Sequence, residues 1–127
     1  MQKRWGSLCG FQGLGATLAQ MTALLCFCTC PDPVTAERIA TTLVGEQLAA
    51  CVNLIPGVRS IYRWQDTVEQ AEEIQLLIKT TVARYPALQA RLLQLHPYEL
   101  PELLAVKPTH GLPAYLDWLG TATRLVE

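Results

Sequence analysis

The sequence CVNLIPGVRSIYRWQDTVEQAEEIQLLIKT, residues 51–80, predicts a long β-hairpin. Its first strand is interrupted by Pro56-Gly57, a pair typical of a turn or bulge, and resumes up to Trp64. The polar residues 65–67 are expected to form the turn, and residues 68–80 the returning strand. A hairpin longer than a small domain needs usually pairs with something beyond its own core. We therefore expect a neighbouring subunit to pair with it.

The segments around the hairpin complete the order β-α-β-β-α-β. They are an apolar strand at 24–29, a helix at about 33–49, a second helix at 83–95, a strand at 103–106, and a short extra helix after Pro113. This order is that of the ferredoxin-like sandwich. The sequence therefore predicts an α+β fold of the ferredoxin-like class with an additional C-terminal helix.

Both long helices have a clear apolar period. Asp32 is a good N-cap and Pro33 a good first residue for the helix at 33–49. In the second helix, four leucines are expected to lie on one side and to face the core. They are Leu88, Leu92, Leu93 and Leu95.

Composition bounds the class of protein. The 127 residues fit one domain, half of them are apolar, 17% are charged, and the formal net charge is −1. This balance argues against a nucleic-acid partner, and no apolar run approaches the roughly 20 residues that span a bilayer. A sequence with so many apolar residues and so few charges is expected to cover some apolar surface between subunits, which favours an oligomer. Residues 1–21, rich in glycine and without period, are predicted to be a disordered leader before a single domain at 22–127.

Five cysteines, an odd number, argue against a secreted disulfide framework and favour a reducing, cytoplasmic location. Cys26, Cys28 and Cys30 alternate with period two, so one strand directs all three thiols to the same face. Two interpretations stay open at this point. A free cysteine often behaves as a small buried hydrophobe, and clustered thiols also suit a soft metal ion.

The sequence HPYELPE, residues 96–102, follows the second helix directly. Its two prolines stiffen the backbone, and a stiff polar loop is a common place for binding groups. His96 offers a nitrogen ligand, while Glu99 and Glu102 offer oxygen ligands or a partner for the imidazole. With one cysteine, such ligands suit copper or another late transition metal. The alternative is a connection whose polar side chains only satisfy local hydrogen bonds.

Trp64 stands at the expected tip of the hairpin and is predicted to anchor an interface. We find no nucleophile elbow, phosphate-binding glycine loop or spaced acid–base pair, so the sequence does not predict an enzyme.

With these residues in view, the chain resembles the CutA family of divalent-cation tolerance proteins. The resemblance covers about residues 22–121 in order and spacing. Its segments are 28–32 (CTCPD), 48–58 (LAACVNLIPGV), 60–64 (SIYRW), 77–80 (LIKT), 96–102 (HPYELPE) and 115–119 (YLDWL).

The resemblance implies a homotrimer held by edge-strand pairing, similar to the trimer of PII signalling proteins, and copper binding without an enzymatic reaction. The family's metal pattern places a cysteine at Cys28 and two consecutive histidines at the end of the second helix. Here the second is His96, but Leu95 occupies the first position. Cys26 and Cys30 are candidates to compensate.

Two functions follow. The first is a trimeric protein of the metal-ion response that binds copper or a related divalent metal through Cys28 and His96. The alternative is a PII-like signalling or scaffold trimer that binds a small ligand or protein in a cleft between subunits. The residues expected to line this cleft are Cys30, Trp64, Lys79, Tyr98, Glu99 and Glu102.

Overall fold

The computed structural model describes residues 22–124, so the leader predicted for residues 1–21 lies outside the described residues. Seven elements follow one another: β1 (Ala23–Cys30), α1 (Pro33–Gly45), β2 (Cys51–Trp64), β3 (Thr67–Thr81), α2 (Tyr85–Leu95), β4 (Leu104–Val106) and α3 (Pro113–Ala122). The strands form one antiparallel sheet in the order β2-β3-β1-β4. This confirms the predicted ferredoxin-like fold with its extra C-terminal helix.

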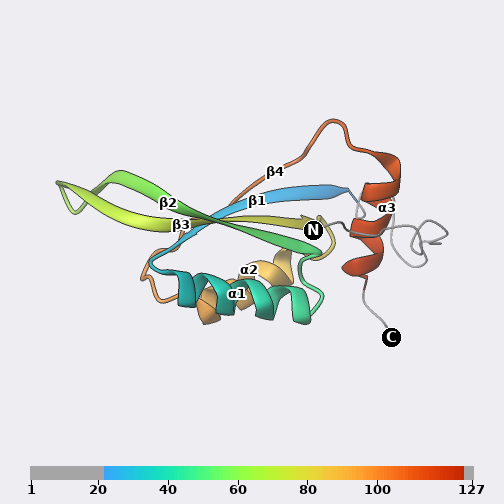
Figure 1. Ribbon diagram of the computed structural model, residues 1–127, viewed down its shortest axis with the longest axis horizontal. Coiled ribbons are helices and arrows are strands. Elements are labelled where there is room, and N and C mark those ends of the chain that lie inside the picture. Colours follow the sequence, from blue (N-terminus) through green and yellow to red (C-terminus); the bar gives the residue numbers. More distant parts are fainter. Residues whose placement is uncertain (1–21, 125–127) are drawn as a thin grey trace.

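The helices divide between two places on the sheet. Helices α1 and α2 lie side by side on one face, and α3 lies at one end of the sheet (Figure 1). None of the helices within residues 22–124 combines the length and apolar character needed to cross a membrane.

The long hairpin of β2 and β3 extends well past α1 and α2 (Figure 1). Trp64 pairs with Thr67 at its tip, and the two turn residues Gln65 and Asp66 both have positive φ, at 50° and 69°. Positive φ at both positions is the geometry of a type I′ hairpin turn. The register shifts at Pro56-Gly57, where Gly57 has φ 78°. The predicted bulge is therefore confirmed.

The core lies between the sheet and the pair of helices. Cys26, Cys28 and Cys30 are fully buried, and they belong to one apolar cluster with Ile39 of α1 and Leu88 of α2. The alternation of thiols along β1 thus gives the shared face that the sequence predicts.

Helix α1 ends at Gly45, earlier than the predicted end near residue 49. Gln47 adopts a left-handed conformation with φ 60°, and the backbone N–H groups of Leu48 and Ala49 both donate to the Leu43 carbonyl, at 2.9 and 3.2 Å. A left-handed residue just past a helix is a common way to end it. Leu48 remains buried outside the helix. Because Leu48 is apolar, it continued the helical spacing of apolar residues in the sequence, and the predicted helix was therefore too long.

The prediction that four leucines lie on one side of α2 is wrong for one of them. Leu88 and Leu92 are fully buried and Leu95 packs partly against the core, but Leu93 is 55% exposed. Residues 88, 92 and 95 follow the i, i+4, i+7 stripe of a helix, and residue 93 lies off it.

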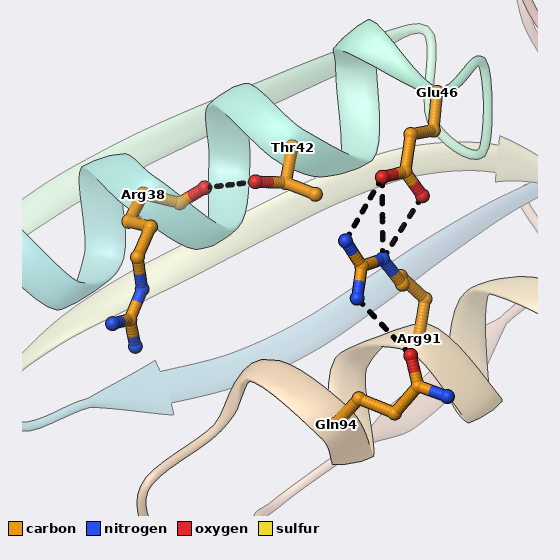
Figure 2. Close-up of polar contacts among 5 residues, drawn as sticks. All are labelled: Arg38, Thr42, Glu46, Arg91 and Gln94. Atoms are coloured by element: carbon orange, nitrogen blue, oxygen red, sulfur yellow. Dashed lines mark hydrogen bonds and ion pairs between the residues drawn. The ribbon is translucent and has the colours of Figure 1, made fainter.

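One ion pair occurs within residues 22–124, and it joins the two helices. Arg91 of α2 reaches Glu46, just past α1, with an Nε–Oε1 distance of 3.0 Å, and it also donates to Gln94 at 3.1 Å (Figure 2). Both members of the pair are partly exposed, so the pair contributes little to stability. Arg38 makes a second link, donating to the Leu95 carbonyl at 3.0 Å.

Candidate metal centre and adjoining cavity

Two thiols and one imidazole meet where β1 ends and α2 gives way to the following loop. The ligand atoms of Cys28, Cys30 and His96 lie within 4.8 Å of one another, and all three residues are buried. Cys28 and Cys30 share a face because they are two residues apart on a strand. His96 caps the end of α2 with an extended backbone, φ −80° and ψ 133°, as expected before a proline. We call these three residues the thiol–imidazole cluster.

Both ring nitrogens of His96 have partners in the chain. The Tyr98 N–H donates to Nδ1 at 3.1 Å, so Nδ1 carries no proton. The proton of the neutral ring therefore lies on Nε2, which donates to the Thr29 carbonyl at 2.8 Å. His96 thus ties the loop to the end of β1. A metal ion at Nε2 would have to replace the bond to Thr29, and because the ring proton would then lie on Nδ1, it would also break the bond from the Tyr98 N–H.

The two clustered thiols differ in acidity. Cys28 lies within reach of the Thr29 carbonyl, at 3.7 Å, and of the Cys30 sulfur. Its hydrogen bond with Cys30 and its burial raise the pKa of Cys28, while the same hydrogen bond lowers the pKa of Cys30. Cys30 is therefore the thiol that ionises first.

The donor set fits a soft transition-metal ion. Thiolate and imidazole are the ligands that copper(I) and zinc prefer. The Cys30 Sγ and His96 Nε2 atoms are 3.9 Å apart, which one ion can bridge with bonds of about 2.0–2.3 Å. Hard ions such as magnesium prefer oxygen donors and do not suit this cluster.

A cavity of about 650 Å³ lies beside the cluster, between the outer part of the hairpin and the loop after α2. Its lining combines aromatic and charged side chains, and we call it the aromatic–carboxylate cavity. The lining residues are Thr29, Ser60, Ile61, Tyr62, Arg63, Trp64, Glu73, Tyr98, Glu99, Leu100, Pro101 and Glu102. Thr29 and Tyr98 also contact His96, so the two sites adjoin.

Glu73 is the residue that sequence reasoning missed. It is only 7% exposed, and its Oε2 accepts a hydrogen bond from the Tyr98 hydroxyl at 2.7 Å. Burial and the Glu73 carboxylate raise the pKa of Tyr98, so the phenol keeps its proton and donates. Glu73 is the first buried residue of β3. A glutamate is rarely buried without a partner, so a carboxylate at this position was the signal available in the sequence.

The predicted site residues fall into two groups, with one exception. Cys28 and His96 come together as metal candidates, and Cys30, predicted for the cleft, lies with them. Trp64, Tyr98, Glu99 and Glu102 all line the cavity.

Lys79 belongs to neither group. It pairs with Cys51 of β2 and Leu25 of β1, and its Nζ donates to the Asn53 side chain.

Comparisons with known proteins agree on one family. The family described as CutA1 divalent ion tolerance protein matches residues 24–122. The chain is 45% identical to the divalent-cation tolerance protein CutA of Escherichia coli O45:K1 (strain S88) over 103 residues, which cover 81% of this chain and 92% of the relative.

Solved structures give the same result. CutA from Xylella fastidiosa matches with a TM-score of 0.79 and 50% identity, covering 81% of this chain and 99% of that one. The divalent cation tolerance protein of Thermus thermophilus also has a TM-score of 0.79, with 45% identity and coverage of 80% and 99%.

Proposed function

Because this chain belongs to the CutA1 divalent ion tolerance protein family, we propose that it binds copper or a related soft metal ion in the thiol–imidazole cluster. The observation that carries the proposal is the meeting of Cys28, Cys30 and His96, whose ligand atoms lie within 4.8 Å of one another. Residues from β1 and from the loop after α2, far apart in sequence, converge there.

Cys30 supplies the third ligand that the sequence otherwise lacks. Leu95 stands where the resemblance leads us to expect a further histidine, and its side chain packs partly against the core. Cys30 lies 3.9 Å from the His96 Nε2 atom and is the more acidic of the two thiols. Two thiolates and one imidazole would favour copper(I) over hard divalent ions.

The test is a copper(I) titration under reducing conditions, followed by calorimetry or by competition with a chromogenic chelator. We expect one ion per chain in the wild type and at least a tenfold weaker affinity in Cys28→Ser, Cys30→Ser and His96→Ala. Cys51→Ser is the matched control, because Cys51 is a half-buried thiol on another strand, outside the cluster. Unchanged affinity in both clustered cysteine variants would overturn the proposal.

We also propose that the protein is a homotrimer assembled through the edges of its sheet. Strands β2 and β4 are the two edges, and apolar side chains on them are exposed, among them Ile61 at 64%, Leu104 at 64% and Val106 at 49%. Unpaired edges with apolar side chains are ready to pair with another chain. Light scattering on the purified protein should give three times the 14.1 kDa chain mass. A monomer would contradict this proposal.

A second function is favoured by the aromatic–carboxylate cavity, which is large enough for a small ligand. We propose that the trimer also serves as a ligand-binding scaffold through this cavity, a role that does not require the metal ion.

A further inference from the structure

The aromatic–carboxylate cavity has an unbalanced charge. Three carboxylates line it, those of Glu73, Glu99 and Glu102, and Arg63 is the one cationic side chain among the lining residues. The lining thus carries two excess negative charges. This excess negative charge would attract a cationic ligand and repel an anionic one.

Glu73 makes the imbalance stronger, because its carboxylate is buried. Its neutral partner is the Tyr98 hydroxyl, at 2.7 Å, and within residues 22–124 the one ion pair lies elsewhere, between Arg91 and Glu46. A buried carboxylate is costly to desolvate and is normally paired with a cation. A positive group in the cavity would supply the missing partner.

The carboxylates do not gather around a single point. Among the described residues, the thiol–imidazole cluster is the one group of three or more potential ligands close enough to share a metal ion. Glu73, Glu99 and Glu102 are therefore too far apart for all three to bind one bare ion. A cation whose charges are separated along its length matches them better.

The rest of the lining suits an apolar chain between two charges. Tyr62, Trp64 and Tyr98 bring three aromatic side chains to the same cavity. Aromatic faces attract ammonium groups and also pack against methylene groups.

From these observations we infer that the cavity binds a small organic dication, a diamine or polyamine with ammonium groups joined by methylenes. Glu73 would pair with one ammonium group, Glu99 and Glu102 would attract the other, and the aromatic side chains would contact the chain between them. The inference names the ligand class for the second function proposed above and does not depend on the metal centre.

The experiment compares three ligands of matched length by calorimetry at low salt, in the presence of a metal chelator. The ligands are 1,4-diaminobutane, 1-aminobutane and butane-1,4-diol. We expect saturable binding of the diamine, at least tenfold weaker binding of the monoamine, and no binding of the diol, since each charge-assisted contact is worth about a factor of ten or more.

Variants then locate the binding site. Glu73→Gln keeps the shape of the side chain and should weaken diamine binding about tenfold. Glu102→Gln, at an exposed position, provides a second test that does not disturb the buried region. Glu69→Gln is the matched control, because Glu69 lies on β3 near the hairpin tip but does not line the cavity.

Several results would overturn the inference. These are equal binding of diol and diamine, absence of saturable diamine binding, preference for an anion such as ATP, or equal affinities in Glu73→Gln, Glu102→Gln and Glu69→Gln. Cys28→Ser separates the two proposals: it should weaken copper binding at least tenfold and leave diamine binding unchanged.

Discussion

His96 serves the fold as well as the candidate metal centre. Its Nε2 donates to the carbonyl of Thr29, which lies 67 residues earlier in the chain, and its Nδ1 accepts from the N–H of Tyr98, two residues later. The ring therefore ties the loop after α2 to the end of β1. A histidine whose two nitrogens are both occupied is first a structural bridge. A metal ion bound at Nε2 would replace the bond to Thr29 and, because the ring proton would move to Nδ1, would also end the bond from Tyr98.

This bridge predicts a stability effect without any metal. His96→Ala removes the imidazole partner of the Thr29 carbonyl and of the Tyr98 N–H, so we expect a loss of about 2–4 kcal/mol in the free energy of unfolding. Chemical denaturation with a chelator present measures it. His110→Ala, at the other, exposed histidine of the chain, should change stability little. Equal effects of the two substitutions would contradict the bridging role.

Cys26 predicts how stability depends on alkaline pH. Burial raises the pKa of its thiol from 9.0 to about 11. The fold favours the neutral thiol, so its contribution is complete below pH 9 and is lost as the pH rises through 11. A shift of this size corresponds to a loss on the order of 2 kcal/mol.

The measurement is the free energy of unfolding at pH 8.5 and at pH 11, for the wild type and Cys26→Val. The valine variant has no thiol to ionise at this position, so its decline over this range should be smaller by about that amount. If both proteins lose the same stability, the environment assigned to Cys26 is wrong.

The residue that ends helix α1 gives a prediction about the stability of that helix. Gln47 is held at φ 60°, a conformation that glycine adopts at no steric cost. Gln47→Gly should therefore stabilise the protein by about 1 kcal/mol. Gln89→Gly, in the exposed middle of α2, should destabilise it by about the same amount. Thermal unfolding of both variants is sufficient, and a loss of stability in both would contradict the left-handed helix end.

The elements show what can be read from the sequence and what cannot. The Asp32-Pro33 start of α1, the thiol face of β1 and the bulge at Pro56-Gly57 all depend on neighbours in the chain, so local patterns predicted them. The end of α1 was missed because Leu48 is buried by tertiary packing and continues the apolar period outside the helix.

The candidate site was predicted only in part for a similar reason. Local sequence brought out Cys28 and the loop from His96 to Glu102, each as a polar or thiol-rich segment. The bonds that join them cross between distant segments, as does the contact of Glu73 with Tyr98, and no local pattern encodes such pairs. Cys30 was assigned to the cleft because its distance from His96 depends on the packing of α2 against the sheet.

At the scale of the whole molecule, the proposed trimer would depend on the edges of the sheet. If β4 pairs with another chain, a charged side chain in place of Leu104 should prevent that pairing, because lysine on an edge strand opposes strand addition. We expect Leu104→Lys to yield monomers in light scattering. Val34→Lys is the control, since Val34 is 79% exposed and lies on helix α1 and not on an edge strand. A Leu104→Lys protein with the same mass as the wild type would contradict pairing through β4.

The most direct test of the proposed function is X-ray absorption spectroscopy of the protein loaded with one copper(I) ion per chain. We expect two sulfur neighbours and one nitrogen neighbour, from Cys28, Cys30 and His96. In Cys30→Ser the number of sulfur neighbours should fall to one. Copper neighbours of nitrogen and oxygen alone, or a spectrum unchanged by Cys30→Ser, would show that the metal does not bind at this cluster.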